Sequence, residues 1–98
     1  MRIKKGVELD GISTNITKIF HIIEFFLKSH GQELVITSGL EGEHKKDSKH
    51  YTGEAIDVRI WDLVDKQDCC TRIREALGDE YDVVLESSHI HIEYDPND

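Results

Sequence analysis

Residues 55–60 read Ala55-Ile56-Asp57-Val58-Arg59-Ile60, and this stretch decides the fold class. Apolar and polar side chains alternate along it, which is typical of a β-strand with one face in the core. The branched residues at 56, 58 and 60 point one way, and Asp57 points the other way. The stretch therefore predicts a strand whose second face presents a carboxylate outside the core.

The segments on either side of this strand predict an α+β domain. Apolar residues at spacings of three and four indicate a helix over about residues 13–29. The other expected elements are a strand at 34–37, a loop at 39–49, a helix at about 66–77 and a hairpin of strands 81–86 and 89–94. A chain of 98 residues forms one core, so we expect a single domain over residues 1–98. Its sheet should be small and antiparallel or mixed, with helices packed on one face.

Composition excludes several classes of protein. The formal net charge of -8 opposes binding to nucleic acid, because a phosphate backbone repels such a surface. The basic start of the chain has no apolar stretch behind it, and no segment is long enough to cross a bilayer. We therefore expect no signal peptide, no membrane partner and synthesis in the cytoplasm. Cys69 and Cys70 are adjacent in a predicted helix, where a disulfide between them is unfavourable, so we expect one in the core and one partly exposed.

A first pattern with possible chemistry begins in the loop before the strand. Residues 48–57 read Ser48-Lys49-His50-Tyr51-Thr52-Gly53-Glu54-Ala55-Ile56-Asp57. His50 lies in the loop, Gly53 allows a tight turn, and Asp57 follows on the polar face of the strand. A neutral imidazole and a carboxylate are two of the usual ligands of catalytic zinc.

A second pattern lies in the last predicted strand. His89, His91 and Glu93 share one face, and the isoleucines between them share the opposite face. Glu86 lies across the hairpin turn from His89. Each pattern alone is typical of an ordinary polar surface or turn. Together, and with the correct face in each case, they favour a metal site that combines His50, Asp57 and a histidine of the last strand.

Both patterns resemble known signatures. The motif Ser48-x-His50-x-x-Gly53-x-Ala55-x-Asp57 resembles that of the zinc D-alanyl-D-alanine carboxypeptidases and the phage L-alanyl-D-glutamate endopeptidases. The ending Glu86-Ser87-Ser88-His89-Ile90-His91 resembles the second signature of that family, in which a glutamate precedes a zinc-binding histidine. The hedgehog signalling domain shares this fold and metal site. The likeness covers about residues 34–94.

The resemblance implies roles for particular residues. Zinc would be bound by His50, Asp57 and one histidine of the last strand, and Glu86 would be the general base. The spacing Glu86-x-x-His89 is that of several carboxypeptidases and favours His89 as the third ligand. The ending His91-x-Glu93 is similar to that of the phage endopeptidases and favours His91. We choose His91 as the ligand and His89 as its neighbour, which hydrogen-bonds to substrate or water.

One departure from the family bears on the substrate. Many members carry an arginine after the first core strand that binds the substrate's terminal carboxylate, whereas this chain has Glu41 and Glu43 there. Its possible substitutes are Arg59, Lys45, Lys46 and Lys49. We therefore expect a zinc peptidase of peptidoglycan stem peptides, of the phage or prophage endolysin type, that cuts within the stem and acts on the wall once released. The alternatives are a carboxypeptidase and a non-catalytic zinc domain of a virion or binding protein.

Overall fold

The structure is a computed structural model that describes residues 1–41 and 48–96, and it contains a five-stranded mixed sheet. The strand order is β1-β2-β3-β5-β4, in which β1 and β2 are parallel and the other neighbours are antiparallel. The elements in chain order are β1 (Arg2–Ile3), α1 (Thr14–Thr17), α2 (Phe20–Ser29), β2 (Val35–Ser38), β3 (Ala55–Arg59), α3 (Lys66–Leu77), β4 (Tyr81–Leu85) and β5 (His89–Tyr94). The predicted α+β class is confirmed.

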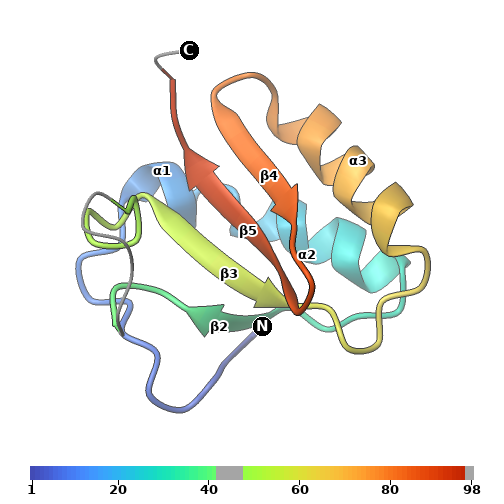
Figure 1. Ribbon diagram of the computed structural model, residues 1–98, viewed down its shortest axis with the longest axis horizontal. Coiled ribbons are helices and arrows are strands. Elements are labelled where there is room, and N and C mark those ends of the chain that lie inside the picture. The colour runs from blue at the N-terminus through green and yellow to red at the C-terminus, as the bar shows by residue number, and fades with distance from the viewer. Residues whose placement is uncertain (42–47, 97–98) are drawn as a thin grey trace.

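One face of the sheet forms the core. In Figure 1, α1 and α2 lie behind the sheet, and α3 packs against α2 and β4. Ile56 and Val58 of β3 and Ile90 and Ile92 of β5 are fully buried in a cluster that includes the helices' apolar residues. The alternate residues of β3 and β5 lie on the other face, where Asp57 and His91 are only half-buried. This open polar face carries the candidate site.

Three local predictions were wrong. The helix expected over residues 13–29 is broken, because α1 ends at Thr17 and α2 begins at Phe20, with Lys18 and Ile19 in a turn between them. The amide of Ile19 donates to the carbonyl of Ile16 at 3.2 Å, and the tight turn lets both isoleucines reach the core. Strand β1 was not expected, because its two exposed residues carry no periodic signal. Cys69 and Cys70 are both buried, so neither is partly exposed.

The C-terminal hairpin agrees closely with its prediction. Strand β5 has the expected bounds, and β4 ends one residue earlier than expected. The amide of Glu86 donates to the carbonyl of His89 at 2.9 Å, which closes the turn at Ser87 and Ser88. No helix among the described residues has both the length and the apolar character needed to span a membrane.

Candidate metal centre

The pairing of β3 with β5 brings the two predicted patterns together. In this antiparallel pair, Asp57 lies directly opposite His91, and Arg59 lies opposite His89. Side chains of directly opposed residues on one face lie within contact distance of each other. The Nδ1 atom of His91 is 2.9 Å from Oδ1 of Asp57. The strand register therefore places two candidate ligands side by side.

His50 reaches the same point from the loop before β3. Its side chain is buried, with 3% of its surface exposed, although the loop is otherwise polar. Gly53 has a φ of +75°, and a Cβ there would lie 2.4 Å from the carbonyl oxygen of Gly11. The amide of Ser13 donates to the Gly53 carbonyl at 2.9 Å. The loop is thus held against the N-terminal segment in a way that only glycine allows.

Hydrogen bonds orient the rings of both histidines. The Nδ1–H group of His50 donates to the carbonyl of Gly39 at 2.9 Å, which directs Nε2 toward Asp57, 3.3 Å away. The Nε2–H group of His91 donates to Glu93 at 2.8 Å, which leaves Nδ1 facing Asp57. Metal-binding histidines almost always have such a partner at the second ring nitrogen.

The three side chains could hold a metal ion. One ligand atom from each of His50, Asp57 and His91 lies within 4.8 Å of the others. Ligands at ordinary zinc distances in a tetrahedral site are roughly 3.3 Å apart, close to the His50–Asp57 separation. The hydrogen bond between Nε2 of His50 and the Asp57 carboxylate occupies the position that a cation would take, so the donor set fits a metal.

The hydrogen bonds among the three side chains also determine the charge states of Asp57 and His91. Burial acts to raise the pKa of Asp57, but hydrogen bonds from His50 and His91 outweigh it and hold that pKa well below its usual range. The hydrogen bond to Asp57 raises the pKa of His91 to about 9, with burial opposing and the Glu93 carboxylate supporting the change. Without a metal, the Asp57 carboxylate is therefore negatively charged and the His91 imidazole is protonated on both nitrogens and positively charged at neutral pH.

The two predicted catalytic residues lie at the edge of this group. The Nε2 atom of His89 is 3.6 Å from Oδ1 of Asp57, and its Nδ1 lies 3.0 Å from the hydroxyl of Ser88. His89 thus neighbours the three candidate ligands. Val84 pairs with His91, so the two side chains share a face of the sheet. Glu86 lies two residues after Val84, and its side chain therefore leaves the backbone on the same face as His91. Its carboxylate is exposed and has no hydrogen bond or ion pair with any residue in the described ranges.

Only part of the loop expected near the substrate lies within the described residues. The Glu41 carboxylate accepts hydrogen bonds from the amides of Glu8 and Gly39, both at 2.8 Å, so it organises the loop. Lys49 is described and does not line the pocket beside Asp57. Glu43, Lys45 and Lys46 lie outside the described residues.

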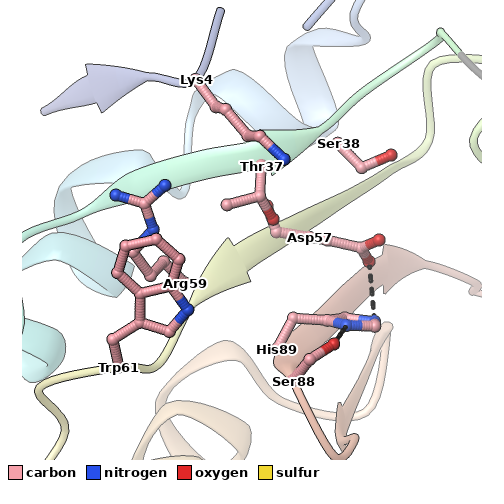
Figure 2. A pocket seen from close by; sticks show the side chains of 8 residues that line it. All are labelled: Lys4, Thr37, Ser38, Asp57, Arg59, Trp61, Ser88 and His89. Carbon is pink, nitrogen blue, oxygen red and sulfur yellow. Dashed lines mark hydrogen bonds and ion pairs between the residues drawn. The ribbon is translucent and has the colours of Figure 1, made fainter.

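A pocket of about 240 Å³ adjoins the metal group, and sequence reasoning missed several of its members, including Lys4 and Trp61. Figure 2 shows Lys4, Arg59 and Trp61 on one side of this pocket and Asp57 with His89 on the other. Arg59 was foreseen as a possible substitute cation. No periodic signal marked Lys4, because the strand before it is only two residues long, and Trp61 follows β3 without a motif.

The first prediction concerns the metal ligands. Protein purified without chelator should carry about one zinc per chain, measured by elemental analysis. His91→Ala should abolish tight binding, because it removes a ligand atom. His89→Ala should weaken binding by only the roughly 10–100-fold typical of a neighbouring group. A filled His91→Ala site with an empty His89→Ala site would reverse the assignment of these two residues.

The second prediction concerns pH. A metal must displace the proton of His91, whose pKa is raised to about 9. The apparent zinc affinity should therefore rise about tenfold per pH unit from pH 7 and level off near pH 9. Calorimetry in buffers of different ionisation enthalpy should detect close to one proton released per zinc at pH 7.5. Affinity and proton release that do not change over this range would contradict the prediction.

The chain was also compared with known proteins. No protein-family model, no curated protein and no solved structure matches it.

Proposed function

We propose that this protein is a zinc metallopeptidase that hydrolyses a peptide bond within bacterial peptidoglycan stems, in the manner of a phage or prophage endolysin. The observation that carries the proposal is the meeting of His50, Asp57 and His91, from one loop and two strands, at one point on the open face of the sheet. The resemblance of residues 48–57 to the signature of zinc peptidases of the cell wall supplies the substrate class.

The ligand set favours zinc and catalysis. Two imidazoles and one carboxylate are a common set in catalytic zinc sites, which keep a fourth position open, whereas structural sites are closed by four protein ligands. Bound zinc would polarise the scissile carbonyl and lower the pKa of the attacking water. Among the described residues, His89 lies near this group, with its Nε2 3.6 Å from Oδ1 of Asp57, but the group of three candidate ligands does not include it.

The residues around the ligands would then have separate tasks. Glu86 would accept a proton from the attacking water and pass it to the leaving amine. Its position opposite His89 at the hairpin turn puts an exposed carboxylate within side-chain reach of the same face. Gly39 and Glu93 hold the ligand rings in place through hydrogen bonds at their second nitrogens. His89 would donate a hydrogen bond to substrate or water.

Two other functions use the same site. A D-alanyl-D-alanine carboxypeptidase needs a cation for the terminal carboxylate, and this chain has Glu41 and Glu43 where the family carries its arginine. A non-catalytic metal-binding domain is favoured by the Glu86 carboxylate, which forms no hydrogen bond or ion pair with the candidate ligands in the described structure. Both alternatives are outcomes of the experiment that follows.

The third prediction is cleavage of the stem. Zinc-loaded protein incubated with purified muropeptides should release fragments cut after the first alanine, identified by mass spectrometry. A chelator should stop the reaction and added zinc should restore it. Release of only terminal D-alanine would establish the carboxypeptidase alternative. If zinc-loaded protein cleaves no muropeptide, the binding domain becomes the better account.

The fourth prediction concerns Glu86. Glu86→Gln keeps the shape of the side chain and removes its basicity, so zinc content should stay near one per chain. Activity should fall by about 10²–10⁴-fold, the range typical of general base catalysis. Glu80→Gln is the matched control, because Glu80 is exposed in the turn before β4. Normal activity of Glu86→Gln would exclude Glu86 from the mechanism.

A further inference from the structure

The loop between β3 and α3 is held by the end of α2. Figure 1 shows this loop, residues 60–65, passing beside the C-terminal end of α2. The amide of Val64 donates to the carbonyl of His30 at 2.8 Å. The amide of Asp62 donates to Oε1 of the buried Gln32 at 2.8 Å. The position of the loop therefore depends on two hydrogen bonds to the segment that ends α2.

The ring of His30 adds a third contact, with α3. Its Nδ1 is 2.8 Å from the carbonyl oxygen of Phe26, one turn earlier in α2. Its Nε2 is 2.9 Å from Oδ2 of Asp68, which lies in the first turn of α3. The ring is largely enclosed, with 13% of the side chain exposed. One side chain thus joins the end of α2 to the beginning of α3.

Both partners of the ring can only accept hydrogen bonds. A carbonyl and a carboxylate have no proton to donate, so both bonds form only when both ring nitrogens carry a proton. The hydroxyl of Ser29, 3.0 Å from Nδ1, donates to the Phe26 carbonyl at 2.8 Å, so it also presents a lone pair to the ring. A neutral imidazole has one N–H group and would lose the bond to either Phe26 or Asp68. The geometry therefore selects the charged form of His30.

The ionisable groups on α3 set the charge of the ring. The hydrogen bonds to Asp68 and to the α2 carbonyl raise the pKa of His30 above its usual value, while burial and the Arg72 guanidinium oppose this change. Arg72 is itself paired with Asp68 at 3.0 Å, so two cations share one carboxylate. The Cys69 thiol also approaches the α2 carbonyl, at 3.6 Å, but burial raises its pKa to about 11 and it stays uncharged.

The loop ends in a residue with an unfavourable backbone conformation. Asp65 is the only non-glycine residue with a positive φ among those that the structure describes, at +52°. Such a conformation persists where the surrounding structure holds it. The Asp65 carboxylate accepts from the amide of Asp68 at 3.1 Å, so one turn of α3 is tied both to the loop and to His30. Within the described residues, neither Asp62 nor Asp65 forms a hydrogen bond or an ion pair with the ring.

We propose that His30 is a proton-dependent clamp, which holds the loop of residues 60–65 and the first turn of α3 against the end of α2 and releases them when the ring loses its proton. The proposal does not depend on the metal group or on the proposed peptidase function. The loop carries Trp61, which packs against the Arg59 guanidinium in the pocket beside Asp57. A looser loop would therefore leave one wall of that pocket less ordered.

The direction of the pH effect follows from the contacts. Because the pKa of His30 in the folded protein lies above the ordinary value of 6.5, the clamp stabilises the fold fully below about pH 6.5. Its contribution is lost as the pH rises through the raised pKa. The loop should therefore be closed in acid and neutral solution and should open more often in alkaline solution.

Hydrogen exchange measured by NMR tests the clamp at the loop itself. The amides of Asp62 and Val64 donate to the segment that ends α2, so their protection reports the opening of the loop. After correction for the intrinsic effect of pH on exchange, their protection should fall roughly threefold to tenfold between about pH 6 and about pH 9, as expected for the loss of one hydrogen bond. The amide of the buried Ile23, within α2, should keep its protection.

A first pair of variants separates His30 from the other titrating groups of the protein. His30→Gln has no titrating side chain at this position, so the pH dependence of loop protection should disappear. His21→Gln is the matched control, because His21 is exposed on the same helix. This control should leave the protection of the loop and its pH dependence unchanged.

A second pair of variants tests the partners on α3. In Asp68→Asn, the amide can accept from the charged ring and can donate to Nε2 of the neutral ring, so both forms are held and the loop should stay protected at about pH 9. NMR titration of this variant should find the pKa of His30 closer to its ordinary value. Arg72→Gln removes an opposing charge and should raise the pKa of His30 further.

Two results would overturn the clamp. The first is an NMR titration in which His30 of the native protein has a pKa at or below the ordinary value. The second is loop protection that falls with pH as steeply in His30→Gln as in the native protein, because another group would then control the loop. If His30→Gln does not fold, Asp68→Asn decides the question, and loop protection that still falls with pH in that variant would overturn the proposal.

Discussion

The antiparallel pairing of β3 with β5 is the constraint on which the rest of the site depends. Asp57 opposes His91 in this register, and the residues that flank them, Ile56 and Val58 in β3 and Ile90 and Ile92 in β5, fill the core. A shift of one residue would turn both polar side chains into the apolar layer and expose these apolar neighbours. Hydrophobic burial therefore fixes the position of the candidate ligands, although neither ligand contributes much to the core itself.

Much of the fold could be predicted because the local signals agreed with the tertiary structure. The alternation in β3 and β5 identified the correct faces, and the helix at Lys66–Leu77 has its predicted bounds. Strand β1 could not be predicted, since two residues have no period and pair only because Arg2 and Lys4 reach the carbonyls of Leu34 and Ile36. The break between α1 and α2 could not be recognised in the sequence, because the apolar residues of both helices face the core.

The candidate site could likewise be predicted only in part. His50, Asp57 and His91 belong to patterns with a recognisable spacing, and the structure brings them together. The preference for His91 over His89 could be argued only from resemblance, whereas the structure supplies ring orientations through Gly39 and Glu93. Lys4 was invisible in the sequence because its relation to Arg59 depends on the order of β1, β2 and β3 in the sheet.

The short edge strand has a consequence for how such a site can change. β1 is held to β2 through hydrogen bonds at Arg2 and Lys4 of 2.8 and 2.9 Å, and its side chains are exposed. Segments of this kind open locally far more easily than the central strands. Fraying of β1 would withdraw Lys4 and leave the pairing of Asp57 with His91 intact. The cationic lining of the pocket and the candidate metal ligands thus belong to parts of the chain with different local stability, so mutation can alter one while the other is preserved.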